Sequence, residues 1–364
     1  MILLIIVATF SILLIIFLRQ PQFGKLPAGE RLQRIQKSPN YKNGQFRNIN
    51  PTPDLAEGTS YFTVMKYFIF NKNKRSRPES VLPSVKTNLH TLDPKKNVLV
   101  WFGHSSYFMQ IDGKKILVDP VLCGYASPVN FTTRSYPGTD VYTPEDIPQI
   151  DYLFLSHDHW DHLDYKTVKE LKPKVGKVIT ALGVGAHLER WGYEKNKVIE
   201  TDWNEEVMLG NGFVVNTIPA RHFSGRGLIR QKSLWISFVL RTPTLTLFIG
   251  GDSGYDSHFA TAGIVYGPFD LAILECGQYD YYWKYIHMMP HEVVQATIDL
   301  KAKKLMPVHW GKFSLANHAW DDPIRQISEL SKSKNIPLLT PMIGEEADLN
   351  SSSLSREWWI EVSC

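Results

Sequence analysis

The chain has 364 residues, of which 43% are hydrophobic and 21% are charged, as is usual for a folded globular protein. Lysine and arginine number 40 and acidic residues 36, so the net charge of +4 gives no sign of a strongly basic surface. The three cysteines (Cys123, Cys276 and Cys364) are scattered, which argues against a disulfide framework and a thiolate zinc site.

The first 18 residues contain no charged side chain and are nearly all leucine, isoleucine, valine and phenylalanine. A helix of that length spans roughly 27 Å, close to the ~30 Å of a bilayer core. Basic residues before the apolar run and a small-residue cleavage site are both missing. We therefore predict an uncleaved transmembrane helix over residues 1–18, with a cleaved signal or a buried helix as alternatives.

Residues 19–84 form a basic segment that we call the N-terminal extension. Between Arg19 and Asn50 it has seven basic residues and one acid, Glu30. Basic residues beside a spanning helix tend to stay in the cytoplasm and attract anionic headgroups. We therefore predict a single-pass membrane protein whose main domain, residues 85–364, lies on the cytoplasmic side. The plainer interpretation of the extension is a solvated linker.

From about residue 97 onwards, short apolar runs alternate with polar and helical segments, which predicts an α/β domain. The expected strands cover residues 98–102, 115–118, 152–155, 213–218, 245–249, 271–274 and 304–308. The expected helices cover residues 165–171, 185–191 and 291–301.

The segment Ser156–Asp164 contains three histidines and an aspartate in the spacing His-x-His-x-Asp-His, directly after an expected strand. These residues are His157, His159, Asp161 and His162. Imidazole nitrogens and carboxylate oxygens are the ligands of zinc where thiolate is absent, and loops after strands often carry catalytic residues. A solvated loop is the alternative, but four donors in six residues favour a metal site.

Three further metal-capable residues follow expected strands: His222, Asp252 and His309. A single histidine in this position is more often structural, and an aspartate after two glycines can close a turn. Together with the first cluster, they make seven donors, enough for two adjacent metal ions with an open position on each.

This set of residues resembles the metallo-β-lactamase superfamily. The resemblance implies an αββα sandwich in which His157, His159 and His222 hold one zinc ion. Asp161, His162 and His309 would hold a second zinc ion, with Asp252 bridging the two.

The motifs are most similar to the branch that hydrolyses N-acylphosphatidylethanolamine, a phospholipase D family. The similarity extends over residues 97–345 and is carried by residues 101–106, 118–121, 156–164, 251–255, 267–270, 307–311 and 313–317. It implies a phospholipid partner and cleavage to N-acylethanolamine and phosphatidic acid. No nucleic-acid partner is expected, and the oligomeric state is left open.

The expected chemistry is attack on phosphorus by a hydroxide shared between two zinc ions, which lower the pKa of water to about neutrality. Asp161 and Asp252 would act by holding the metals. The resemblance places a substrate-contacting histidine at His287, which would bind a phosphate oxygen or protonate the leaving group. Tyr282 and Trp283 are expected to face the substrate, although a surface-loop histidine and ordinary core rings are the alternatives.

Two carboxylates, Asp119 and Asp158, are candidates to orient metal-bound imidazoles, and Asp158 could instead cap a helix. Two other activities remain open: a lactonase of the same fold acting on a small soluble substrate, and a nucleic-acid phosphodiesterase. The second would need a large basic surface and an RNA-binding insertion, and the sequence shows neither. A metal-bound scaffold without activity would normally lack a ligand.

Overall fold

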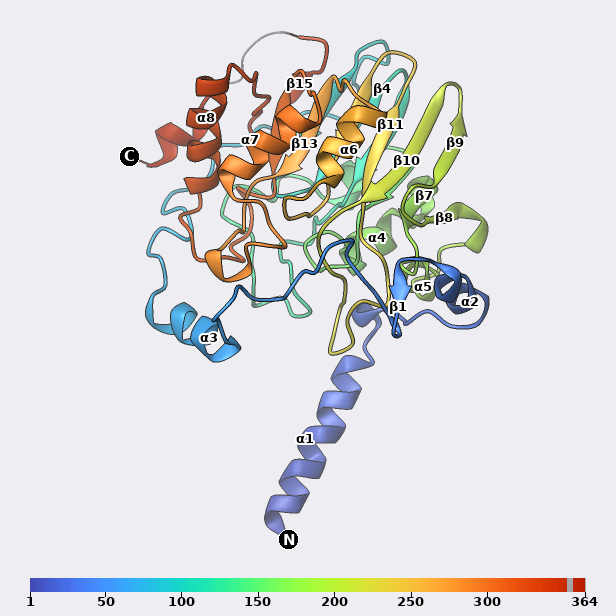
Figure 1. Cartoon of the computed structure of the whole chain (residues 1–364), viewed down its shortest axis with the longest axis vertical. Helices are drawn as coiled ribbons and strands as arrows, with labels where there is room; N and C mark the ends of the chain where they lie inside the picture. Colours follow the sequence, from blue (N-terminus) through green and yellow to red (C-terminus); the bar gives the residue numbers. More distant parts are fainter. Residues whose placement is uncertain (352–355, 364) are drawn as a thin grey trace.

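Two mixed β-sheets form the body of the protein (Figure 1). One sheet has seven strands in the order β15-β3-β4-β5-β6-β7-β8, and the other has six in the order β14-β13-β12-β11-β10-β9. This computed structural model describes residues 1–351 and 356–363, so Cys364 lies outside the described residues. Cys123 and Cys276 are free thiols.

The seven-stranded sheet comprises β3 (Val98–Trp101), β4 (Tyr107–Ile111), β5 (Lys114–Val118), β6 (Ile150–Leu155), β7 (Val175–Ala181), β8 (Val198–Thr201) and β15 (Glu346–Asp348). The six-stranded sheet comprises β9 (Glu206–Gly210), β10 (Phe213–Pro219), β11 (Ile236–Arg241), β12 (Thr246–Ile249), β13 (Leu271–Glu275) and β14 (Leu305–Val308). The helices of the body are α4 (Tyr165–Leu171), α5 (Gly185–Arg190), α6 (His258–Val265), α7 (Pro290–Asp299) and α8 (Asp322–Lys334).

The hydrophobic core lies between the two sheets. The rings of Phe154 in β6 and Phe238 in β11 meet there with centroids 5.0 Å apart. Helices α6, α7 and α8 lie together beside β13, and α5 packs against β8 at the far edge of the other sheet (Figure 1). The expected α/β fold of the metallo-β-lactamase type is therefore present.

Parallel pairing brings the candidate residues to one edge of the sandwich. Strand β5 pairs in parallel with β6. In the other sheet, β13 lies between β12 and β14 and pairs in parallel with both. The carboxyl ends of parallel neighbours lie on the same side of a sheet, and ligand sites of α/β folds form there. The loops after these strands therefore converge.

The prediction of a transmembrane helix at residues 1–18 is wrong. Helix α1 (Ile2–Leu18) has 17 residues, which is about 26 Å at the rise of an α-helix and short of a ~30 Å bilayer core. Among the described residues, no helix combines the length and the apolarity that a membrane crossing requires. The same finding overturns the predicted location, a single-pass membrane protein with its catalytic domain on the cytoplasmic side.

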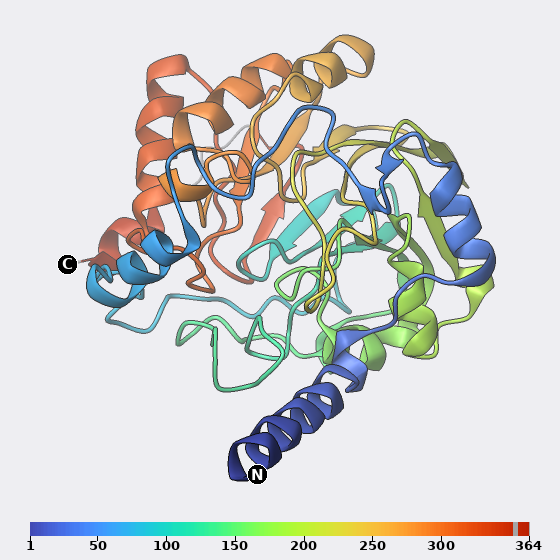
Figure 2. The same ribbon diagram turned by 60° about the horizontal axis from the view of Figure 1, so that its bottom comes forward.

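The N-terminal extension folds against the body. It contains α2 (Gly29–Lys37), a small ribbon of β1 (Tyr41–Lys42) and β2 (Gln45–Phe46), and α3 (Tyr61–Phe70). Figure 2 shows it in blue, running from α2 across one end of the body to α3. Half-buried Arg31 fixes α2, because its guanidinium lies 2.6 Å from the carboxylates of both Glu189 and Glu200. The domain division at residues 84 and 85 stays a prediction.

Candidate metal centre

Hydrogen bonds with polar side chains fix the backbone of the loop after β6. Asp119, directly after β5, accepts hydrogen bonds from the backbone N–H and the hydroxyl of Ser156, at 2.8 and 2.6 Å. On the other side of the loop, buried Arg226 donates to the carbonyl oxygens of Asp158 and Leu163 at 2.8 and 2.6 Å. These bonds replace the regular ladder that ends at Leu155, so the four donors of the loop project from a fixed backbone.

The structure brings all seven predicted ligands together in two adjacent groups, and Asp252 and His309, one from each, also form a third group with His287. In each group, one ligand atom per residue lies within 4.8 Å of the others. The first group is His157, His159, His222 and Asp252, and the second contains Asp161, His162, His309 and an unpredicted residue, His104. This division matches the pairing that the family resemblance implies, and the role of each residue as a ligand stays a prediction.

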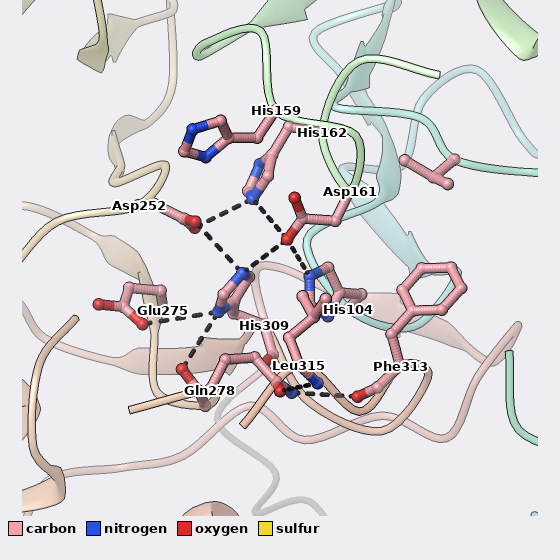
Figure 3. Close-up of polar contacts among 12 residues, drawn as sticks. His104, His159, Asp161, His162, Asp252, Glu275, Gln278, His309, Phe313 and Leu315 are labelled. Atoms are coloured by element: carbon pink, nitrogen blue, oxygen red, sulfur yellow. Dashed lines mark hydrogen bonds and ion pairs between the residues drawn. The ribbon is translucent and has the colours of Figure 1, made fainter. Parts of the chain in front are cut away.

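Asp252 links the first group to the second, because it contacts His162 and His309 (Figure 3). Its Oδ2 is 3.7 Å from His222 Nε2 and 3.2 Å from His309 Nε2. Its Oδ1 is 3.1 Å from His162 Nε2. A carboxylate in this position can present one oxygen to each of two neighbouring cations.

The electrostatics of the cluster are those of buried imidazoles around two carboxylates. The side chains are buried, which disfavours every charged form. Even so, the neighbouring histidines hold the pKa of Asp161 and Asp252 well below the usual range. Burial also works against the cation of His309, but Asp252 and Asp161 raise its pKa to about 10. Asp161 and Asp252 therefore stay ionised and can offer negative charge to a cation.

The donor set fits a metal ion. His159 Nε2 is buried and has no hydrogen-bond partner among the described residues. His162 Nε2 and Asp252 Oδ1 are close but lack hydrogen-bond geometry. Buried polar atoms without partners are rare in native structures and often mark an ion. Nitrogen and oxygen donors without thiolate suit zinc and its neighbours in the first transition series.

His104 was missed at the sequence level. It follows β3 and is fully buried, and its Nε2 lies 2.9 Å from Asp161 Oδ2 (Figure 3). Burial and the nearby His309 lower the pKa of His104 to about 3, so the ring is neutral. A neutral imidazole can donate Nε2–H to Asp161. The signal was present, because Gly103-His104 ends an apolar run just as the other candidates do.

Glu275 was also missed, although it ends the expected strand at residues 271–274. This buried carboxylate lies 3.3 Å from His287 Nδ1 and 3.7 Å from His309 Nδ1. Its Oε1 accepts a hydrogen bond of 2.7 Å from the backbone N–H of Met288. Burial raises the pKa of Glu275 above its ordinary value. Glu275 therefore fixes the ring of His287 beside the cluster.

A cavity of about 300 Å³ opens onto the two groups. Its apolar wall includes Trp283, Ile286 and Leu315, and His287 also lines it. Tyr282 packs instead on Tyr67 of α3, with ring centroids 5.1 Å apart. The roles of His287, Tyr282 and Trp283 stay predictions.

The N-terminal extension contributes to the same cavity through Asp54, Leu55 and Tyr61. No motif marks these residues in the sequence, because they reach the cavity only through the path of the extension over the body.

The two candidate orienting carboxylates differ. Asp119 Oδ2 lies 2.9 Å from His162 Nδ1, so it can fix that imidazole. Asp158 accepts hydrogen bonds from Gly225 N and Ser233 Oγ, both at 2.7 Å, and neither belongs to a predicted ligand. It does not cap α4, whose cap is Asp164.

Residues 114–310 match the family model described as a β-lactamase superfamily domain, which is more than half of the chain. The chain belongs to the β-lactamase superfamily. Within that superfamily it is a metal-dependent hydrolase.

Two curated relatives cover most of the chain. An uncharacterized protein of Mycobacterium tuberculosis (strain H37Rv) is 34% identical over 89% of this chain and 88% of its own length. N-acyl-phosphatidylethanolamine-hydrolyzing phospholipase D 1 of Caenorhabditis elegans is 29% identical over 73% of this chain and 82% of its own length. Among solved structures, the metallo hydrolase Igni18 of Ignicoccus hospitalis has a TM-score of 0.54 at 18% identity. The match covers 70% of this chain and 98% of the Igni18 chain, and it shows that the two proteins share a fold.

Proposed function

We propose that this β-lactamase-superfamily hydrolase cleaves the phosphodiester bond of a phospholipid at a centre of two zinc ions. The proposed substrate is N-acylphosphatidylethanolamine, and the products are N-acylethanolamine and phosphatidic acid. The observation that carries the proposal is Asp252 placed between two groups of buried donors at the base of one cavity. The similarity to the phospholipase D of Caenorhabditis elegans supports the choice of substrate.

The seven predicted ligands would coordinate the two zinc ions in two sets that share one residue. His157, His159 and His222 would hold one ion, Asp161, His162 and His309 the other, and Asp252 would contact both. When bound, the two ions supply a water of lowered pKa and positive charge for the oxygens of the phosphoryl group.

The other side chains of the site position the substrate. Because Glu275 engages His287 Nδ1, the Nε2 of that ring is left to face a phosphate oxygen or the leaving oxygen. The apolar wall formed by Trp283, Ile286 and Leu315 offers a place for lipid chains and excludes water from the reacting bond.

The test uses the whole chain, because the N-terminal extension lines the cavity. Protein loaded with zinc is assayed on N-acylphosphatidylethanolamine in mixed micelles, on bis-p-nitrophenyl phosphate and on an acyl lactone. We expect turnover of both phosphodiesters and its loss after treatment with a chelator. Turnover of the lactone alone would overturn the proposal.

A further inference from the structure

Arg230, between β10 and β11, lines the same cavity but is not one of the predicted ligands. Its guanidinium carbon lies 3.9 Å from the centroid of the Phe223 ring. That ring in turn contacts the ring of His159, with centroids 4.4 Å apart. A single aromatic ring therefore separates Arg230 from the metal centre.

The charge of Arg230 is balanced by Asp54 of the N-terminal extension. Arg230 Nη1 lies 3.0 Å from Asp54 Oδ2, and the hydroxyl of Tyr61 donates to the same oxygen over 2.9 Å. The side chains of Arg230 and Asp54 are 35% and 43% exposed. Ion pairs this exposed contribute little to stability, so stability does not explain why they meet in the cavity wall.

Among the described contacts of Arg230, only Nη1 has an acceptor, so other donors of the guanidinium are left over. Its Nε is shielded from water and has no hydrogen-bond partner within residues 1–351 and 356–363. A buried N–H without an acceptor is unfavourable. The Nη2 amine also has no acceptor among the described residues, and, unlike Nε, it is open to a ligand oxygen because the side chain is 35% exposed. Because Asp54 already balances the charge, an uncharged carbonyl oxygen suits this donor better than a second anion.

We propose that Arg230 determines substrate specificity, its guanidinium binding a carbonyl oxygen of the substrate next to the phosphodiester. This inference rests on the proposed function for the position of the phosphodiester. The guanidinium of Arg230 lies one aromatic ring away from the candidate metal centre. That spacing suits a substrate in which a short linker, such as ethanolamine, joins the phosphate to an amide carbonyl. Asp54 and Tyr61 hold the guanidinium in place and disfavour substrates with an additional negative charge.

The first experiment compares Arg230→Lys and Arg230→Met with the unaltered enzyme on two phosphodiesters. N-acylphosphatidylethanolamine carries the carbonyl, and bis-p-nitrophenyl phosphate does not. Lysine keeps the charge that pairs with Asp54 but lacks the planar fork of arginine. We expect kcat/KM for the lipid to fall about tenfold in both variants, as for one lost hydrogen bond. The value for bis-p-nitrophenyl phosphate should stay within about twofold, well inside that difference.

The second experiment measures binding of N-acylethanolamine, which has the carbonyl but no phosphate, by calorimetry to the zinc-loaded protein. We expect Arg230→Lys to weaken binding about tenfold. Arg34→Lys is the control, because Arg34 makes an exposed ion pair with Glu205 and does not line the cavity. It should bind as the unaltered protein does.

Equal losses on both phosphodiesters, or unchanged binding in Arg230→Lys, would overturn the role of Arg230. Lack of phosphodiester turnover with intact, arginine-dependent binding would count against the proposed function instead.

Discussion

At the scale of single residues, the centre is a set of imidazoles whose protonation is controlled by two carboxylates. The neighbouring Asp252 and Asp161 raise the pKa of His162 well above its usual range and that of His309 to about 10, although burial opposes both shifts. Burial lowers the pKa of His159 to about 3, so this ring is neutral throughout the physiological range. The ligands are therefore not equivalent in the metal-free protein.

This difference predicts that zinc binding releases protons. At pH 7, the metal-free protein holds protons on His162 and His309, and both must leave before the imidazoles can bind zinc. We expect release of about two protons per fully loaded molecule at pH 7, and affinity for zinc that rises as pH increases toward 10. Calorimetry in buffers of different ionisation enthalpy measures the release, and zinc binding without proton uptake by the buffer would contradict the prediction.

The raised pKa values of His162 and His309 also determine how the stability of the metal-free protein changes with pH. When the pKa of a histidine is higher in the folded state than its ordinary value of ~6.5, the bound proton stabilises the fold, and this contribution is complete below pH ~6.5. This contribution is lost as pH rises through about 10, the pKa of His309. The zinc-loaded protein lacks these protons and should not share the loss.

At the scale of elements, every expected strand is present, and the unpredicted strands differ in how strong a local signal they carry. Strand β9 alternates exposed and half-buried residues at a sheet edge, and its apolar run, Val207 to Leu209, is only three residues long. Strand β4, in contrast, is fully buried between β3 and β5, and its apolar residues are interrupted by Gln110. The amide of Gln110 donates to the carbonyl oxygen of Asp93, which compensates for its burial.

The ends of β5 and β6 are coupled through Asp119, which predicts an effect on metal binding. Asp119 accepts three hydrogen bonds, two from Ser156 and one from His162, whereas asparagine offers one acceptor oxygen. We expect Asp119→Asn to lower zinc affinity about 10- to 100-fold, as is typical when the partner of a metal-bound histidine is lost. Competition with a chelating dye measures this.

The matched control is Asp112→Asn. Asp112 accepts hydrogen bonds from Thr244 on a turn, and it does not line the cavity. Zinc affinity should be unchanged in this variant. Equal affinities in the two variants would show that Asp119 does not support His162.

At the scale of the whole molecule, the N-terminal extension is part of the site rather than only a linker. Asn48 donates from Nδ2 to the carbonyl oxygen of His222 at 2.8 Å, and its Oδ1 accepts from the N–H of the same residue at 3.1 Å. Together with Asp54 and Tyr61 in the cavity wall, these contacts tie the extension to the candidate centre.

Loss of the Asn48 side chain should therefore affect both stability and metal binding. We expect Asn48→Ala to lower the free energy of unfolding by about 1–3 kcal/mol, because it leaves buried polar groups of His222 unpaired. Zinc affinity should fall at the same time. Asn50→Ala is the control, since the Asn50 side chain makes an exposed contact with Asp256 and none with a predicted ligand among the described residues. Reduced stability with unchanged zinc affinity would limit the extension to a structural role.

The sequence by itself determined the class of fold, most of its central strands and the seven donors, because apolar runs and the residues that end them are local features of the chain. Only the tertiary structure decided that His104, Glu275, Asp54 and Arg230 join those donors. These contacts join residues far apart in the chain, so they depend on how the sheets pack and where the extension runs. The structure also decided against the membrane-spanning helix, because apolar composition alone does not fix how long a helix is.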